Sequence, residues 1–120
     1  MSIYKGLPLI RQFSINRKVI KEIRQLYGLN RGQLEILCGA YSLQEPDQPF
    51  FTVPALIQWL LVLPSTDVYK YIHQLEQIGY IEITRKTSSP SRANYYHITG
   101  PGELVLRRYA RIMESHLNRV

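Results

Sequence analysis

The stretch of residues 52–80 constrains the fold of this chain more than any other, because two helix-length apolar patterns lie on either side of a proline. In the first pattern, Thr52 is a good N-cap, and Pro54 falls in the first turn, where its missing amide hydrogen costs nothing. Pro64 then ends the pattern, so we expect a short helix followed by a turn. The apolar residues at helical spacing are Leu56, Ile57, Leu60 and Leu61.

A second helix is expected directly after this turn, capped by Ser65 or Thr66 and ended by Gly79. Its apolar stripe would pack on the first helix, and its other side would face solvent. Two short helices joined by a tight turn form a helix-turn-helix, whose second helix can lie in a DNA groove. The expected buried stripe is Val68, Ile72, Leu75 and Ile78. The candidate groove-facing residues are Ser65, Thr66, Tyr69, Lys70 and His73.

Length and composition predict a single domain, because 120 residues with 45% hydrophobic content suffice for one core. No apolar run is long enough to span a bilayer, and residues 1–12 lack the apolar segment of a signal peptide. Cys38 is the only cysteine, so it cannot form an internal disulfide, and its place on an apolar helix face favours a buried, inert thiol. We therefore expect a soluble cytoplasmic protein with no membrane partner.

The net charge of +6 is unevenly distributed along the chain. Residues 1–31 contain seven Lys or Arg against one Glu, whereas residues 32–79 contain one Lys against five acids. Basic segments thus flank an acidic helix-turn-helix. A polyanion such as nucleic acid is the direct interpretation, and the alternative is a moderately basic, well-solvated protein.

The two ends of the chain predict amphipathic helices. One begins around residues 14–16 after an extended arm, and Gly28 ends it; the other is capped by Thr99 and has a long apolar stripe. So long an apolar stripe must be buried against another surface, and a second copy of the chain is a more economical candidate than the chain's own core. The expected dimerisation residues are Ile20, Ile23, Leu106, Tyr109, Met113 and Leu117.

The middle of the chain predicts one more helix and a hairpin. Asn30 followed by Gln33 resembles a capping box, and residues 42–51 contain two prolines and form a loop, in which Phe50 and Phe51 could make a very short strand. Residues 80–86 and 94–99 alternate like half-buried strands around a polar tip that contains Arg92.

Helices followed by a hairpin with a basic tip have the order of a winged helix-turn-helix, and the chain resembles the MarR-type transcriptional regulators over roughly residues 28–110. The matching pieces are Leu29-Asn30 with Gln33 and Leu37, Thr52 with Leu56, Val68-Tyr69-Lys70 with Leu75-Glu76, Gly79-Tyr80-Ile81, Arg92, and Ile98-Thr99 with Gly102.

The resemblance implies a mainly α (α+β) fold with a two-stranded wing, and a homodimer held by its N- and C-terminal helices. Residues 1–27 would be the arm and first dimerisation helix, 28–99 the winged helix-turn-helix, and 100–120 the second dimerisation helix. The recognition helix would enter the major groove of double-stranded DNA, and the wing the minor groove, where arginine meets an enhanced negative potential. The expected DNA-binding residues are Ser65, Thr66, Tyr69, Lys70, His73, Arg85, Lys86 and Arg92.

Two other classes of function remain alternatives. The acidic, tyrosine-bearing recognition helix favours a winged helix used for protein contact, as an accessory module of a plasmid, phage or conjugation system. An enzyme is disfavoured, because His73, His97 and His116 fall on different elements without clustered carboxylates. No cofactor or metal is expected, and no residue pattern selects a pocket for a small effector. A regulator of this kind would be cytoplasmic and associated with the nucleoid.

Overall fold

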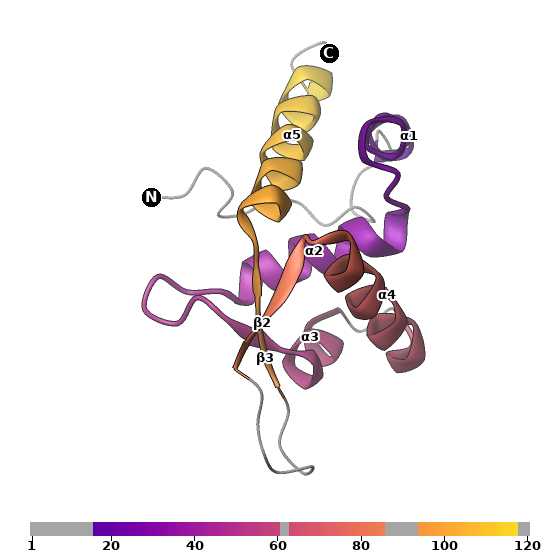
Figure 1. The fold of residues 1–120 in the computed structure, drawn as a ribbon. Helices are drawn as coiled ribbons and strands as arrows, with labels where there is room; N and C mark the ends of the chain where they lie inside the picture. Colours follow the sequence, from indigo (N-terminus) through magenta and orange to yellow (C-terminus); the bar gives the residue numbers. More distant parts are fainter. Residues whose placement is uncertain (1–15, 61–62, 86–93, 118–120) are drawn as a thin grey trace.

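Five helices and a small sheet make up the residues described by a computed structural model of the chain, which are 16–60, 63–85 and 94–117. The predicted mainly α fold with a winged helix-turn-helix is confirmed (Figure 1). In chain order the elements are α1 (Asn16–Tyr27), α2 (Arg31–Leu43), β1 (Phe51–Thr52), α3 (Val53–Leu60), α4 (Ser65–Ile78), β2 (Ile81–Arg85), β3 (Tyr95–Ile98) and α5 (Gly100–Leu117).

Helix α2 forms the centre of the molecule and packs against α3, α4, α5 and β3. Every residue from 33 to 40 is buried, so the helix is enclosed on all sides along its middle. Its start has the predicted capping box: the Asn30 side chain accepts from the Gln33 amide at 2.8 Å, and the Gln33 side chain accepts from the Asn30 amide at 2.9 Å. The helix continues to Leu43, two residues into the segment predicted to be a loop.

The sheet has three antiparallel strands in the order β1-β3-β2, in which β2 and β3 form the predicted two-stranded wing. The additional strand is β1, which pairs Phe51 with Tyr96 just before α3 begins. Strands β2 and β3 pair Ile81 with Ile98, and a register shift follows Ile83. Because β1 continues directly into α3, the wing is hydrogen-bonded to the residues that enter the helix-turn-helix.

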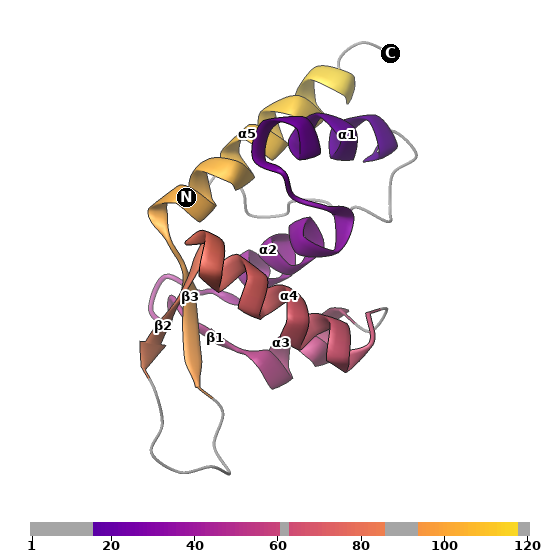
Figure 2. The ribbon, with the colours of Figure 1, turned by 45° about the vertical axis from the view of Figure 1, so that its right-hand side comes forward.

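Helices α1 and α5 lie together at the end of the molecule opposite the wing (Figures 1 and 2). This packing corrects the expected dimerisation stripe, because Ile23, Leu106 and Tyr109 are fully buried within the chain and Met113 is 2% exposed. Ile20 is half-buried against the same core, and the side chain of Leu117 lies outside the described part. The large apolar side chains that the described parts of α1 and α5 expose are instead Leu26 and Leu104.

The ends of α4 differ in how well the sequence predicts them. Gly79 ends the helix with φ 100°, in the left-handed conformation that glycine adopts freely. At the start, however, the N-cap is Pro64, whose carbonyl accepts from the Asp67 and Val68 amides, and Ser65 is already helical. Ile78 is also 49% exposed, so the buried stripe of α4 is one residue shorter than predicted.

Among the described residues, no helix is both long and apolar enough to cross a membrane.

Candidate nucleic-acid interface

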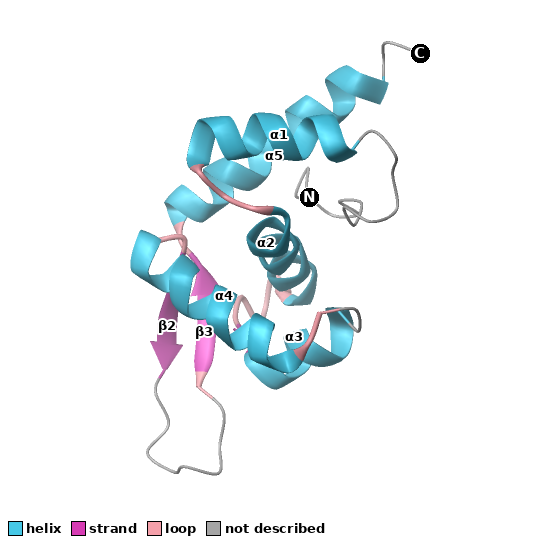
Figure 3. Ribbon diagram, turned by 90° about the vertical axis from the view of Figure 1, so that its right-hand side faces the viewer, coloured by secondary structure: helices cyan, strands magenta, loops and turns pink. Residues whose placement is uncertain are grey.

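Helices α3 and α4 form the helix-turn-helix, and α4 packs on α2, α3 and β2 (Figure 3). Val68, Ile72 and Leu75 are buried on its inner side. The opposite side brings together the predicted groove-facing residues, all of which are exposed: Ser65, Thr66, Tyr69, Lys70 and His73. The core contacts of α4 thus leave a continuous polar and aromatic surface free along one side.

Two contacts hold α4 against α2, and the sequence reasoning missed both. The side-chain nitrogen of Gln33 (Nε2) donates to the side-chain oxygen of Gln74 (Oε1) at 2.8 Å. The Tyr71 ring covers Gly32 so closely that a Cβ at this glycine would collide with it. The Tyr71 side chain is half-buried against the core. The glycine within the first turn of α2 was the sequence signal for this close approach.

Lys70 is the only Lys or Arg of α4, and its ammonium group lies near Asp67 and the Tyr71 ring. The Nζ atom is 3.9 Å from Asp67 Oδ1 and 5.0 Å from the centre of the Tyr71 ring. The Lys70 and Asp67 side chains are 56% and 40% exposed, so solvent screens this ion pair and the lysine can exchange it for another anion at little cost.

The wing is built from β2 and β3, which lead toward the end of the molecule opposite α1 (Figures 1 and 2). Thr84 Oγ1 and His97 Nδ1 are 2.6 Å apart across these strands, and the rings of Phe50 and Tyr95 meet edge to face. The backbone of Arg85 closes β2 opposite Tyr95. The Arg85 side chain and the predicted wing residues Lys86 and Arg92 lie outside the described part of the chain.

Thr99 connects the recognition helix to the last helix. Its hydroxyl donates to the Gly79 carbonyl at the end of α4 (2.6 Å) and accepts from the Gly102 amide in the first turn of α5 (3.2 Å). The cap was predicted from the sequence, but the bond to Gly79 was not, because it joins positions twenty residues apart. The same hydroxyl therefore fixes the start of α5 and the exit of α4.

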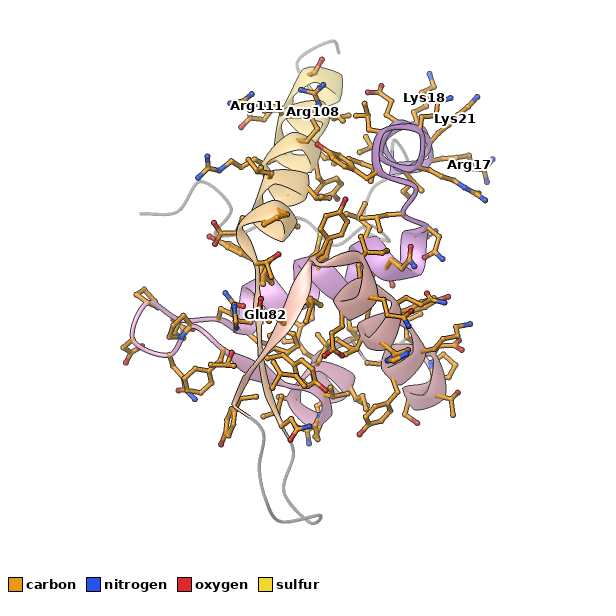
Figure 4. All side chains as sticks on the ribbon, in the orientation of Figure 1. Arg17, Lys18, Lys21, Glu82, Arg108 and Arg111 are labelled. Atoms are coloured by element: carbon orange, nitrogen blue, oxygen red, sulfur yellow. The ribbon has the colours of Figure 1, made fainter. Side chains whose placement is uncertain are left out.

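The cations of α1 do not belong to this surface. Arg17, Lys18 and Lys21 project outward from α1 at the upper end of the molecule, whereas the wing points to the lower end (Figure 4).

The buried titratable groups are not suited to catalysis. Burial, and to a smaller extent the charge of Glu35, raises the pKa of Cys38 to about 12. Burial is also the main cause of the raised pKa of the Tyr109 hydroxyl. Glu35 itself lies 3.5 Å from the Arg31 Nε atom. The described residues contain no group of His, Cys, Asp and Glu side chains that could hold a metal ion.

The sequence matches no family model and no curated protein. Solved structures, however, resemble the chain along most of its length. A DNA-bound mutant of MepR from S. aureus is 15% identical, with a TM-score of 0.72 over 92% of this chain and 75% of that one.

Two further structures give the same result. Apo MarR from E. coli is 16% identical, with a TM-score of 0.65 over 94% of this chain and 81% of that one. FabT from Streptococcus pneumoniae, in complex with DNA, is 20% identical, with a TM-score of 0.63 over 88% of this chain and 72% of that one. The chain therefore has the fold of the MarR-type winged-helix regulators.

Proposed function

We propose that this protein is a DNA-binding transcriptional regulator and not an enzyme. The observation that carries the proposal is the exposed side of α4 beside a wing, in a fold whose solved neighbours include MepR bound to an oligodeoxyribonucleotide and FabT bound to DNA. An α-helix is about 10–12 Å across with its side chains and fits a major groove about 12 Å wide. Helix α4 would lie in that groove, and the wing would follow the adjacent minor groove.

The proposed DNA contacts divide between the two elements. Ser65 and Thr66 start α4, where hydroxyl groups suit contacts to phosphate or base edges. Lys70 is exposed enough to leave Asp67 for a phosphate. Arg85, Lys86 and Arg92 supply the positive charge of the wing segment. Such a protein would act in the cytoplasm, at the nucleoid.

We also propose that the protein acts as a homodimer through the outer faces of α1 and α5. Leu26 and Leu104 are 50% and 57% exposed there. Leu26 lines a groove of about 490 Å³, together with Arg108, Arg111 and Ile112. A second copy would cover these leucines, and light scattering tests this: a monomer at micromolar concentration argues against the contact.

Salt dependence of DNA binding tests the proposed function. Each neutralised phosphate releases counterions, so the logarithm of affinity falls with the logarithm of salt by about 0.9 per contact. Fluorescence anisotropy on a random duplex should show a steep salt response, and Lys70→Ala with Arg92→Ala should reduce its slope by about 2. Arg17→Ala with Lys18→Ala is the matched control, because it removes two cations from the opposite end of the molecule.

The alternative function, contact with a protein, is favoured by one observation: α4 has Lys70 against Asp67 and Glu76, a net charge of −1. A salt response that is flat, or that Lys70→Ala with Arg92→Ala leaves unchanged, would overturn the DNA proposal in favour of this alternative.

A further inference from the structure

The exposed side of α4 has two chemically different flanks. Successive residues of a helix are about 100° apart, so Lys70, Asp67 and Gln74 share the flank next to α2. Their contacts confirm that position: Gln74 accepts from Gln33 of α2, and the Lys70 ammonium lies near Asp67 and the Tyr71 ring. The charged groups of the N-terminal half of α4 therefore gather on the α2 side.

In the first two turns of α4, the flank away from α2 contains no Asp, Glu, Lys or Arg, and Glu76 follows on this flank one turn after His73. Thr66, Tyr69 and His73 follow one another there at spacings of three and four residues, so their side chains are neighbours on one helix face. Tyr69 is 54% exposed and is one of the few large apolar side chains that the described residues leave in solvent. Its ring gains free energy from any apolar surface that covers it.

This arrangement matches one base better than the others. Guanine is usually read by Arg or Lys, but α4 contains no Arg, and the ammonium group of its Lys70 lies beside Asp67 and the Tyr71 ring. Thymine presents a C5 methyl group in the major groove, which is read by apolar contact, for example with a threonine methyl or an aromatic ring. Thr66 and Tyr69 offer both of these groups on one flank.

We propose that α4 selects thymine in the major groove through contact of the thymine methyl group with the Tyr69 ring. The proposal rests on the proposed DNA-binding function and specifies which base the helix recognises. Lys70 then serves the phosphate backbone and contributes affinity without base preference.

Removing only the methyl group tests the proposal. The probes are two duplexes of about 30 base pairs with one non-repeating A·T sequence, in which one duplex has uracil at every thymine. The wild-type protein should bind the uracil duplex about fourfold more weakly for each methyl group that Tyr69 covers. Tyr69→Ala should bind both duplexes equally. Tyr69→Phe keeps the ring and should keep the preference, whereas Lys70→Ala should weaken binding to both duplexes by the same factor.

The outcomes separate this inference from the function on which it rests. Binding of neither duplex at low salt refutes both. Equal binding of the two duplexes by the wild-type protein leaves DNA binding standing and overturns the thymine preference. A preference that survives in Tyr69→Ala shows that another residue detects the methyl group, and it overturns the assignment to Tyr69.

Discussion

Replacing Thr99 by valine should destabilise the protein measurably, because one hydroxyl makes two hydrogen bonds, one within the first turn of α5 and one to the end of α4. It accepts from the Gly102 amide at 3.2 Å and donates to the Gly79 carbonyl at 2.6 Å. Valine keeps the shape of threonine and the β-branch, so the change leaves no cavity. The loss is therefore confined to the hydrogen bonds.

The magnitude follows from the two bonds. Loss of an N-cap side chain costs about 1 kcal/mol, and a further hydrogen bond contributes on the order of 1 kcal/mol. Because Thr99 is only half-buried, water partly replaces both partners. We expect a decrease of about 1–2 kcal/mol in the free energy of unfolding, and a decrease in Tm of about 3–8 °C for a chain of this length.

Urea unfolding followed by circular dichroism measures this change, at one protein concentration because a dimer's stability depends on it. The midpoint should fall while the m-value stays constant. Thr84→Val is the matched control, because it also removes a threonine hydroxyl from a hydrogen bond, to His97, but at an exposed strand position where valine is favoured. It should change the free energy of unfolding by less than about 0.5 kcal/mol.

Two results would refute the reasoning about Thr99. One is a midpoint for Thr99→Val equal to that of Thr84→Val, which would mean that the link between α4 and α5 contributes nothing. The other is an equal loss in Thr99→Ser, which retains the hydroxyl and should retain most of the stability.

Three further predictions concern buried and glycine positions. Because burial raises the pKa of Cys38 to about 12, iodoacetamide at pH 8 should label this thiol only after unfolding. In the unfolded chain the pKa of this thiol is near 9.0. Its contribution to the free energy of unfolding is therefore complete below pH 9 and is lost as the pH rises toward 12. Cys38→Ala should reduce that loss in urea titrations. Gly79→Ala should lower the free energy of unfolding by about 1–2 kcal/mol, since φ is 100° there, and full stability would contradict the left-handed cap. Gly102→Ala should lower it by about 1–3 kcal/mol, because the added methyl group meets the Tyr80 carbonyl oxygen; an unchanged Tm would contradict that contact.

The parts of the fold that the sequence predicts are those decided within a few residues. The capping box of Asn30 and Gln33, the left-handed Gly79 and the cap at Thr99 each depend on one side chain and the nearest backbone groups. The same is true of the hairpin, whose alternation is visible in each strand. These local signals were enough to order the elements of a winged helix-turn-helix.

The partner of each apolar stripe was not predictable, because amphipathicity shows which face is buried and not what covers it. The stripe of α5 was expected to meet a second copy, but Leu106 and Tyr109 are fully buried within the chain, where α5 packs against both α1 and α2. Leu26 lies at the edge of the α1 stripe and faces a groove beside Arg108 and Arg111. Spacing likewise places Lys70 on one side of α4 but does not show that its ammonium group lies near the Tyr71 ring.

Affinity and base preference should therefore be separable in this protein. Helix α4 has a net charge of −1, from Lys70 against Asp67 and Glu76, so it cannot supply most of the attraction to phosphates. If the protein binds DNA as proposed, that attraction should come mainly from the cations of the wing segment, among them Arg92. Tyr69→Ala should then abolish the preference for thymine over uracil without changing the salt slope, because it removes no charge. Arg92→Ala should reduce the slope by about 1 and leave the preference intact. If either variant changed both the salt slope and the preference for thymine, the wing and α4 would not contact DNA independently. The separation of affinity from base preference would then be wrong.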